Sequence, residues 1–212
     1  MNLFFCNNEG IETRREIKKY IRYYQTSKGK QIAQFESDII SKHMPVNGFL
    51  LSIGCGPAVI ETRLNEKRKD IYIISIDNDK DMLSVVPFHL HPICADATFL
   101  PFVSSSFDIV VCITSLEFIH DPKKVLLQIH RVLKPGGIML ALLLNPKSDF
   151  VQQKRNDSTS YIGNHLHNQN YDIIFRFIQQ HYGKINTYVV PDEYMKDYSS
   201  FQHRLLMMEA SK

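Results

Sequence analysis

The sequence predicts an α/β fold built on one mixed sheet of seven strands, with helices on both faces. Five short runs rich in Ile, Leu and Val alternate with helical segments, as is typical of parallel strands joined by crossover helices. The last two apolar runs have no helix between them, so they should pair antiparallel. We therefore expect five parallel strands followed by a C-terminal antiparallel hairpin.

Size and composition favour one globular domain. The chain has 212 residues, of which 44% are hydrophobic and 22% charged. No apolar run approaches the roughly 20 residues of a membrane-spanning helix, and no secretory signal pattern opens the chain. The four cysteines never occur as C-x-x-C, so neither a zinc site nor a disulfide framework is indicated. Unpaired thiols fit a reducing compartment, and we expect a cytoplasmic protein without a membrane segment.

Two helices are expected before the first strand, over residues 11–24 and 31–43. The second places Ile32, Phe35 and Ile39 at helical spacing, and Pro45 follows as a stop signal. Residues 14–30 are locally basic although the net charge of the whole chain is only +3. A solvated helix face explains these charges better than a nucleic-acid patch.

The five parallel strands are expected where apolar residues run almost continuously instead of alternating, which indicates burial on both faces of a sheet. Helices are expected between them, near residues 58–67, 80–86 and 122–133. Asp121 is a good N-cap for the last of these, with Pro122 at its first position. The strand runs are 49–53, 71–76, 92–95, 107–113 and 138–144.

The C-terminal part begins with a polar stretch, residues 145–170, that is long for a loop and therefore expected to be functional. A helix over 171–181, ended by Gly183, is expected next. Residues 185–190 and 203–208 then form the hairpin.

Polar groups stand where the first three strands end. The first strand runs into Gly54 and Gly56, which let the backbone approach a ligand closely. Asp77 ends the second strand, 23 residues after Gly54, about the spacing at which an acidic residue receives ribose hydroxyls. Asp96 ends the third strand, where its carboxylate can accept from an exocyclic adenine amine. These groups should meet at the carboxyl edge of the sheet.

The same turn narrows the class of ligand. A dinucleotide fingerprint would need glycine at position 59, where Val59 stands, and the Gly-Lys-Ser/Thr of a P-loop is absent. An adenosine-bearing ligand without a pyrophosphate fits better.

With these residues the sequence resembles the class I S-adenosylmethionine-dependent methyltransferases, in particular the ubiquinone-biosynthesis-type, or type 11, branch. The resemblance implies a Rossmann-like fold and the cofactor S-adenosylmethionine, with S-adenosylhomocysteine as product. It is carried by five segments in their order and spacing: residues 50–56, 76–77, 94–102, 106–111 and 131–137.

The resemblance also implies cofactor contacts. In such relatives the N-terminal segment with Tyr20, Thr26, Gly29 and, beyond them, Glu36 folds over the methionine end of the cofactor. The implied cofactor-binding residues are Tyr20, Thr26, Gly29, Gly54, Cys55, Gly56, Asp77, Asn78, Asp96, Ala97 and Ile113.

Two positions depart from the family pattern. Ser52 stands where an acidic residue usually helps to hold the ammonium group of the cofactor, and Ala58 stands where a third glycine is usual. Without that acid, the ammonium group is expected to rely on backbone carbonyls, such as those near Ile113.

The acceptor is expected to be a small molecule, bound under a substrate lid formed by residues 145–170. Phe150, Tyr161 and His165 are the candidate substrate-binding residues. If the acceptor needs a general base, His120 and Glu117 are the candidates just past the fourth strand. The histidine pairs lack further ligands at matching spacing, so no metal site is expected.

The expected organisation is a single methyltransferase domain over residues 1–212, as a monomer or homodimer. It comprises an N-terminal helical cap (1–45), a cofactor-binding core (46–144), the lid (145–170) and a C-terminal helix with hairpin (171–212).

Other functions stay open at this point. One is a methyltransferase that acts on RNA or protein, with the basic segment as a docking surface. Another is a non-catalytic partner protein that binds S-adenosylmethionine. An NAD-linked oxidoreductase is a more distant alternative. Enzymes that methylate the exocyclic amines of nucleic-acid bases are disfavoured, because residues 113–116 lack their Asn/Asp-Pro-Pro-Tyr/Phe motif.

Overall fold

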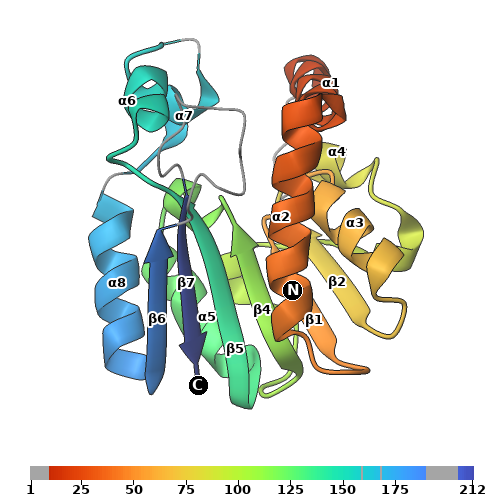
Figure 1. Ribbon diagram of the computed structural model, residues 1–212, viewed down its shortest axis with the longest axis vertical. Helices are drawn as coiled ribbons and strands as arrows, with labels where there is room; N and C mark the ends of the chain where they lie inside the picture. Colours follow the sequence, from red (N-terminus) through yellow and green to blue (C-terminus); the bar gives the residue numbers. More distant parts are fainter. Residues whose placement is uncertain (1–9, 159, 168, 190–204) are drawn as a thin grey trace, which may run out of the picture.

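The computed structural model describes residues 10–158, 160–167, 169–189 and 205–212, and it contains one sheet of seven strands (Figure 1). The strand order is β3-β2-β1-β4-β5-β7-β6. Strands β1 to β5 pair in parallel, and β7 runs antiparallel to both β5 and β6. The strands are β1 (Phe49–Ile53), β2 (Tyr72–Asp77), β3 (Pro92–Cys94), β4 (Phe107–Ile113), β5 (Leu133–Leu144), β6 (Lys184–Val189) and β7 (Leu205–Ser211). The predicted mixed sheet and its C-terminal antiparallel pair are confirmed.

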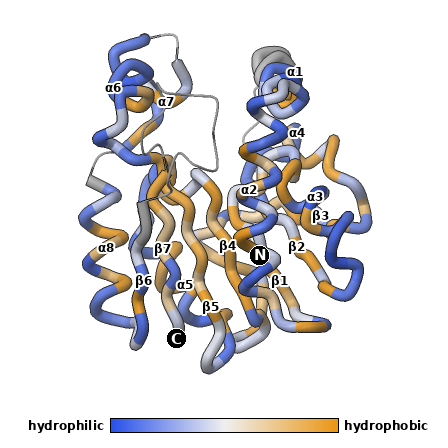
Figure 2. The backbone as a smooth tube through the Cα atoms, viewed as in Figure 1, coloured by the Kyte–Doolittle hydropathy of each residue, from blue (hydrophilic) through white to orange (hydrophobic). Residues whose placement is uncertain are grey.

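The sheet is buried on both faces, as the continuous apolar runs predict. Successive residues of β1 and β4 belong to different cores: Leu51 and Val110 pack into one, Leu50 and Ile109 into the other. Helices α5 (Pro122–Val132) and α8 (Gln169–His181) cover the first core, and α2 (Ser27–His43) and α3 (Val59–Lys67) cover the second. Figure 2 shows the resulting pattern, with hydrophobic strands inside and hydrophilic helix surfaces outside.

The remaining helices gather near the carboxyl ends of the parallel strands (Figure 1). They are α1 (Gly10–Gln25), α4 (Lys80–Leu83), α6 (Asp149–Arg155) and α7 (Tyr161–His165). The one-turn helices η2 (Ala97–Phe99) and η3 (Leu116–Phe118) follow β3 and β4, whereas η1 (Phe88–Leu90) precedes β3. Among the helices described, none has the combination of length and apolar character that crossing a membrane requires.

The prediction of a loop over residues 145–170 is wrong, since this stretch contains α6, α7 and the start of α8. Both short helices lie within a polar stretch, and one or two turns show too little periodicity to identify a helix. A local signal was present, because Ser148 caps α6 by accepting a hydrogen bond from the Val151 N–H.

Element boundaries differ at β5 and at the hairpin. Strand β5 begins at Leu133 instead of residue 138, because Leu133 pairs with Phe107 across a register shift. Gly136 in this segment has a φ of 76°, in the left-handed region that favours glycine. Strand β7 extends to Ser211, three residues past its expected end, while residues 190, 203 and 204 of the expected hairpin lie outside the described residues.

The junction between α1 and α2 depends on a glycine. Thr26 caps α2 by accepting from the Gly29 N–H at 3.1 Å, and its hydroxyl donates to the Tyr23 carbonyl at 2.6 Å. A Cβ atom at Gly29 would lie 2.1 Å from the Tyr23 carbonyl oxygen, which is backbone and cannot move aside. Gly29 therefore allows the end of α1 to pack against the first turn of α2.

We expect Gly29→Ala to lower the free energy of unfolding by about 1–3 kcal/mol, because the methyl group forces the two helices apart. Gly183→Ala is the matched control, since a Cβ there meets no atom within 4 Å. Denaturant unfolding of both variants checks this, and equal stability of the two would contradict the packing role of Gly29.

Candidate functional site

The turn between β1 and α3 has a backbone that ordinary residues seldom adopt. Gly54, Gly56 and Ala58 all have positive φ, at 69°, 53° and 52°. A Cβ at Gly54 would lie 2.6 Å from the Ser115 Cβ, so this glycine is required for close packing. A Cβ at Gly56 would meet nothing within 4 Å. The backbone at Gly56 is therefore open to a ligand, while Ala58 bears a left-handed conformation that costs an L-residue about 1–2 kcal/mol.

Asp77 fixes this turn to the end of β2. Its Oδ2 accepts from the Gly56 N–H at 2.8 Å, and its Oδ1 accepts from the Asp79 N–H at 2.9 Å. Burial raises the pKa of the Asp77 carboxyl group above its ordinary value, although these hydrogen bonds act in the opposite direction. The carboxylate is thus oriented by backbone donors and retains lone pairs for a ligand.

The other predicted groups at strand ends lie along the same edge of the sheet. Cys94, the last residue of β3, pairs with Asp77, and Asp96 follows two residues later. Asp96 is exposed, and its side chain caps η2 by accepting from the Thr98 N–H at 2.8 Å. Ala97 is the first residue of η2. Asn78 is exposed beside Asp77, and Ile113 ends β4. The structure therefore brings these residues to one edge, as predicted.

The N-terminal cap also reaches this edge. The rings of Tyr20 and Tyr24 pack against each other, with centroids 5.0 Å apart. The Tyr20 side chain is 38% exposed, yet burial of its hydroxyl raises its pKa well above the ordinary value, and the charge of Glu61 and the Cys55 thiol add to the shift. Tyr20 is therefore near the glycine turn, whereas Thr26 and Gly29 are already engaged in the α1–α2 junction.

Two buried carboxyl groups beside this turn were not identified from the sequence as a pair. Glu36 on α2 and Glu61 on α3 are 2% and 4% exposed. Burial raises the pKa of Glu36 to about 8 and that of Glu61 to about 7, and the charge of Glu61 adds to the shift of Glu36. A signal did exist, because Glu61 shares the buried face of α3 with Ile60 and Leu64.

The segment after β4 is tied tightly into the fold. Thr114 has a φ of 44°, which is unusual for a β-branched residue, and the Ser115 hydroxyl donates to the Ile53 carbonyl at 2.9 Å. Glu117 is fully buried, and its Oε1 accepts from the Leu144 N–H at 2.8 Å. His120 is exposed, with its ring centroid 6.0 Å from that of His167. Of the two candidate bases, His120 is accessible to solvent and Glu117 is not.

Two of the predicted substrate-binding residues, Tyr161 and His165, lie on α7. Tyr161 is 59% exposed, and its ring stacks on His165 with centroids 4.3 Å apart. Burial of its hydroxyl and the charges of Asp77 and Asp79 raise the pKa of Tyr161. The tyrosine hydroxyl therefore lies within electrostatic reach of the carboxylates at the end of β2. Phe150 is half-buried against the second core instead.

Of the three cysteines in the described residues, two are unpaired, as expected, and one is not. Cys55 and Cys112 are free and buried, whereas Cys94 is disulfide-bonded. Cys6 lies outside the described residues. The prediction of unpaired thiols is therefore wrong for Cys94.

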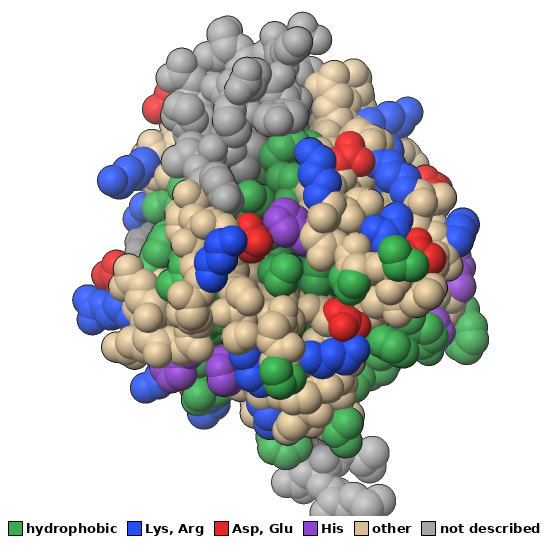
Figure 3. Space-filling view, turned by 60° about the horizontal axis from the view of Figure 1, so that its bottom comes forward, with side chains coloured by type: hydrophobic (Ala, Val, Ile, Leu, Met, Phe, Trp, Pro, Cys, Tyr) green, Lys and Arg blue, Asp and Glu red, His purple; other side chains and the backbone are tan. Residues whose placement is uncertain are grey.

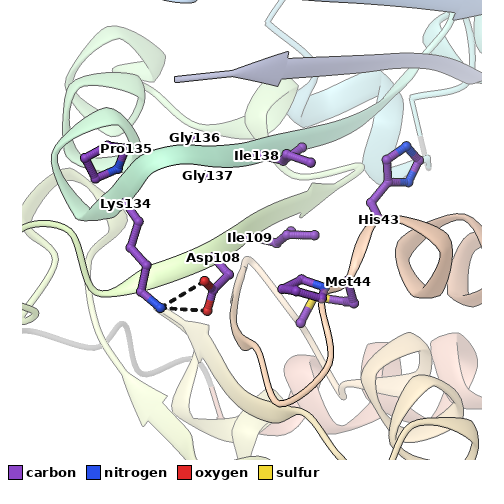
Figure 4. Close-up of a pocket in the computed structure, with 10 residues that line it drawn as sticks. His43, Met44, Asp108, Ile109, Lys134, Pro135, Gly136, Gly137 and Ile138 are labelled. Carbon is purple, nitrogen blue, oxygen red and sulfur yellow. Dashed lines mark hydrogen bonds and ion pairs between the residues drawn. The ribbon is translucent and has the colours of Figure 1, made fainter.

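A cavity of about 400 Å³ lies at the opposite edge of the sheet, around the amino ends of β4 and β5 (Figure 4). Its principal charges are already paired, since the Lys134 ammonium group donates to both Asp108 oxygens at 2.9 and 2.8 Å. Figure 3 turns this lower end of the molecule forward and shows Lys and Arg side chains interspersed with Asp and Glu. The cavity is separate from the strand ends that carry Gly56 and Asp77.

Comparison with known proteins agrees with this geometry. Residues 51–141 match the model of a family described as "Methyltransferase domain". That segment holds most of β1, all of β2 to β4 and most of β5, and the match confirms the resemblance inferred from the sequence.

Curated relatives share this segment within longer proteins. The biotin biosynthesis bifunctional protein BioHC of Saccharophagus degradans is 32% identical over 108 residues, which are 48% of this chain and 19% of that protein. The mitochondrial arginine-hydroxylase NDUFAF5 of Rattus norvegicus is 33% identical over 129 residues, which are 57% of this chain and 35% of that protein. The chain thus spans well under two thirds of the length of these relatives.

Solved structures show the same fold over more of the chain. A SAM-dependent methyltransferase from Thermotoga maritima has a TM-score of 0.72 at 17% identity, covering 93% of this chain and 97% of that one. The plantazolicin methyltransferase BpumL, solved with SAH, has a TM-score of 0.67 at 15% identity, covering 94% and 90%. At these identities the likeness confirms the Rossmann-like fold.

The buried Glu117 predicts a pH dependence of stability. Burial raises its pKa from 4.5 to about 7, so the folded state binds this proton more tightly than the unfolded state does. The resulting stabilisation is complete below pH 4.5 and is lost as the pH rises through about 7. The free energy of unfolding should therefore fall across this window, by at most about 1.4 kcal/mol per pH unit for this group.

Denaturant unfolding at several pH values checks this expectation. Glu117→Gln keeps the acceptor for the Leu144 N–H but cannot titrate, so its slope should be shallower than that of the wild type. Glu66→Gln, an exposed position on α3, should leave the slope unchanged. Identical slopes for all three proteins would show that Glu117 does not titrate as described.

Proposed function

We propose that this chain is an S-adenosylmethionine-dependent methyltransferase that acts on a small molecule. One arrangement carries the proposal: the open backbone at Gly56 lies next to the Asp77 carboxylate, which two N–H groups hold in place. The family match of residues 51–141 supports it. So does the likeness to BpumL, which was solved with SAH.

The groups at the carboxyl edge fit an adenosyl cofactor. Asp77 offers carboxylate lone pairs to ribose hydroxyls, and the exposed Asp96 can accept from the adenine amine. When bound, the cofactor supplies a methyl group on a sulfonium, ready for in-line displacement by a nucleophile. The remaining proposed contacts are Gly54, Cys55, Gly56, Asn78, Ala97 and Ile113 at the edge, with Tyr20, Thr26 and Gly29 from the cap.

The proposed acceptor lies between this edge and the lid. Tyr161 is within electrostatic reach of Asp77, stacks on His165, and has its ring centroid 5.4 Å from that of Phe118. These rings offer apolar faces that orient an acceptor and exclude water, and such orientation is the main protein contribution when a cofactor supplies the reactive group. Phe150 supports this wall from the second core.

We propose His120 as the general base where the acceptor is a phenol or a protonated amine. It is exposed and opposes His167 of the lid, so an acceptor proton can reach it. Glu117 fits a positioning role better, because its carboxyl group is buried and holds the Leu144 N–H at the end of β5. The main role proposed for the protein is to orient the acceptor, and a general base is needed only where the acceptor must lose a proton.

A second candidate function is modification of a protein. The similarity to NDUFAF5, named an arginine-hydroxylase, favours this alternative over RNA modification. Incubation with methyl-labelled S-adenosylmethionine and a cell extract separates the cases, because the label then enters either the small-molecule or the protein fraction. Label in neither fraction, despite cofactor binding, would favour a non-catalytic partner protein.

We propose that residues 1–212 form a single domain, monomeric or homodimeric, in the cytoplasm. The continuous sheet from β3 to β6 supports one domain. The two free thiols fit a reducing compartment, whereas the disulfide of Cys94 does not. The NDUFAF5 relatives are named as mitochondrial, so cell fractionation is the deciding measurement.

Asp77→Ala should weaken binding of S-adenosylhomocysteine by about 100-fold, since it removes a charged acceptor and frees the Gly56 N–H. Asp96→Ala should have a smaller effect, because its carboxylate is exposed to water. Calorimetric titration measures both, and Asp172→Asn on the exposed side of α8 is the control. Unchanged affinity in both variants, with unaltered melting temperatures, would rule out this site.

A further inference from the structure

Two carboxyl groups lie buried together between the cap and the cofactor edge. Glu36 comes from α2 and Glu61 from α3, and these helices pack against each other. The charge of Glu61 acts on Glu36, on the Cys55 thiol and on the Tyr20 hydroxyl. The pair therefore lies beside the glycine turn.

Neither carboxyl group has a cationic partner within the part of the chain that the structure describes. Glu36 Oε2 is buried without any hydrogen-bond partner. Glu61 Oε1 accepts from the Ser52 hydroxyl at 2.5 Å. Lys67, the basic residue in the last turn of α3, is engaged by Asp38 on the outside of α2.

Two buried acids without a cation are costly for a protein to keep. A buried carboxylate is tolerated when a countercharge or several hydrogen bonds compensate its lost hydration. Here the compensation is incomplete, so burial raises the pKa of Glu36, and a positive charge beside the pair would stabilise both ionised carboxylates. A ligand with a cationic group supplies it.

We propose that Glu36 and Glu61 together hold the ammonium group of the amino-acid end of the cofactor, with the Ser52 hydroxyl orienting Glu61. The inference rests on the proposed function, because it assigns one end of the same ligand. It replaces the expectation that backbone carbonyls near Ile113 serve this ammonium group. An amine fits better than a metal ion, since no group of three ligating side chains gathers among the described residues.

The test compares two ligands that differ in this end only. S-adenosylhomocysteine carries the amino-acid group, and 5′-methylthioadenosine has the same adenosine and thioether without it. In calorimetric titrations, Glu61→Gln and Glu36→Gln should each weaken S-adenosylhomocysteine at least tenfold and change 5′-methylthioadenosine less than twofold. Glu66→Gln, exposed on α3, is the matched control.

The outcomes separate this inference from the proposed function. If wild-type protein binds neither ligand, the proposed function fails. If it binds both, but the glutamine variants bind S-adenosylhomocysteine as the wild type does, only the assignment of the pair fails. Equal weakening of both ligands would show that the two residues merely support the fold.

Proton release provides a second readout. In the ligand-free protein the burial of Glu36 favours its protonated form at neutral pH, so capture of an ammonium group should displace a proton. Titrations in buffers of different ionisation enthalpy should show more protons released by S-adenosylhomocysteine than by 5′-methylthioadenosine, and Glu36→Gln should reduce the difference. The other titratable groups around the pair are Tyr20, Tyr24, Cys55 and Asp77. Equal release by both ligands would overturn the inference.

Discussion

Burial of the sheet on both faces is the constraint on which the rest of the structure depends. Because Leu50 and Leu51 enter opposite cores, most of the interior on both faces of the sheet is apolar. Accessible polar groups collect where strands end, and the parallel arrangement brings the ends of β1 to β4 to one edge. The Asp77 carboxylate then fixes the turn at Gly56 against that edge.

The sequence allowed the sheet and this edge to be predicted because both depend on short-range patterns. Continuous apolar runs identify strands buried on both faces, and a residue that directly follows such a run is placed at the end of its strand. Gly54, Asp77 and Asp96 could be positioned in this way without knowledge of the tertiary structure.

The features that could not be predicted from the sequence depend mostly on contacts between residues far apart in the chain. The pairing of Leu133 with Phe107 extends β5, and no local pattern encodes it. Helices α6 and α7 are too short to show a period. The juxtaposition of Glu36 with Glu61 depends on the packing of α2 against α3, and Gly29 is explained only by the carbonyl of Tyr23 behind it. For the same reason Glu117 could not be recognised as buried.

Glu117 connects the segment after β4 both to the end of β5 and to the end of the stretch 145–170. Its side chain accepts from the Leu144 N–H, and its backbone carbonyl accepts from the His167 N–H at 3.0 Å and from the Asn170 side chain at 3.2 Å. The C-terminal end of the stretch proposed as a lid is thus anchored to the segment that follows β4. If that stretch opens to admit an acceptor, its hinge must lie before His167, because the residues from His167 onward are hydrogen-bonded to the sheet side of the molecule.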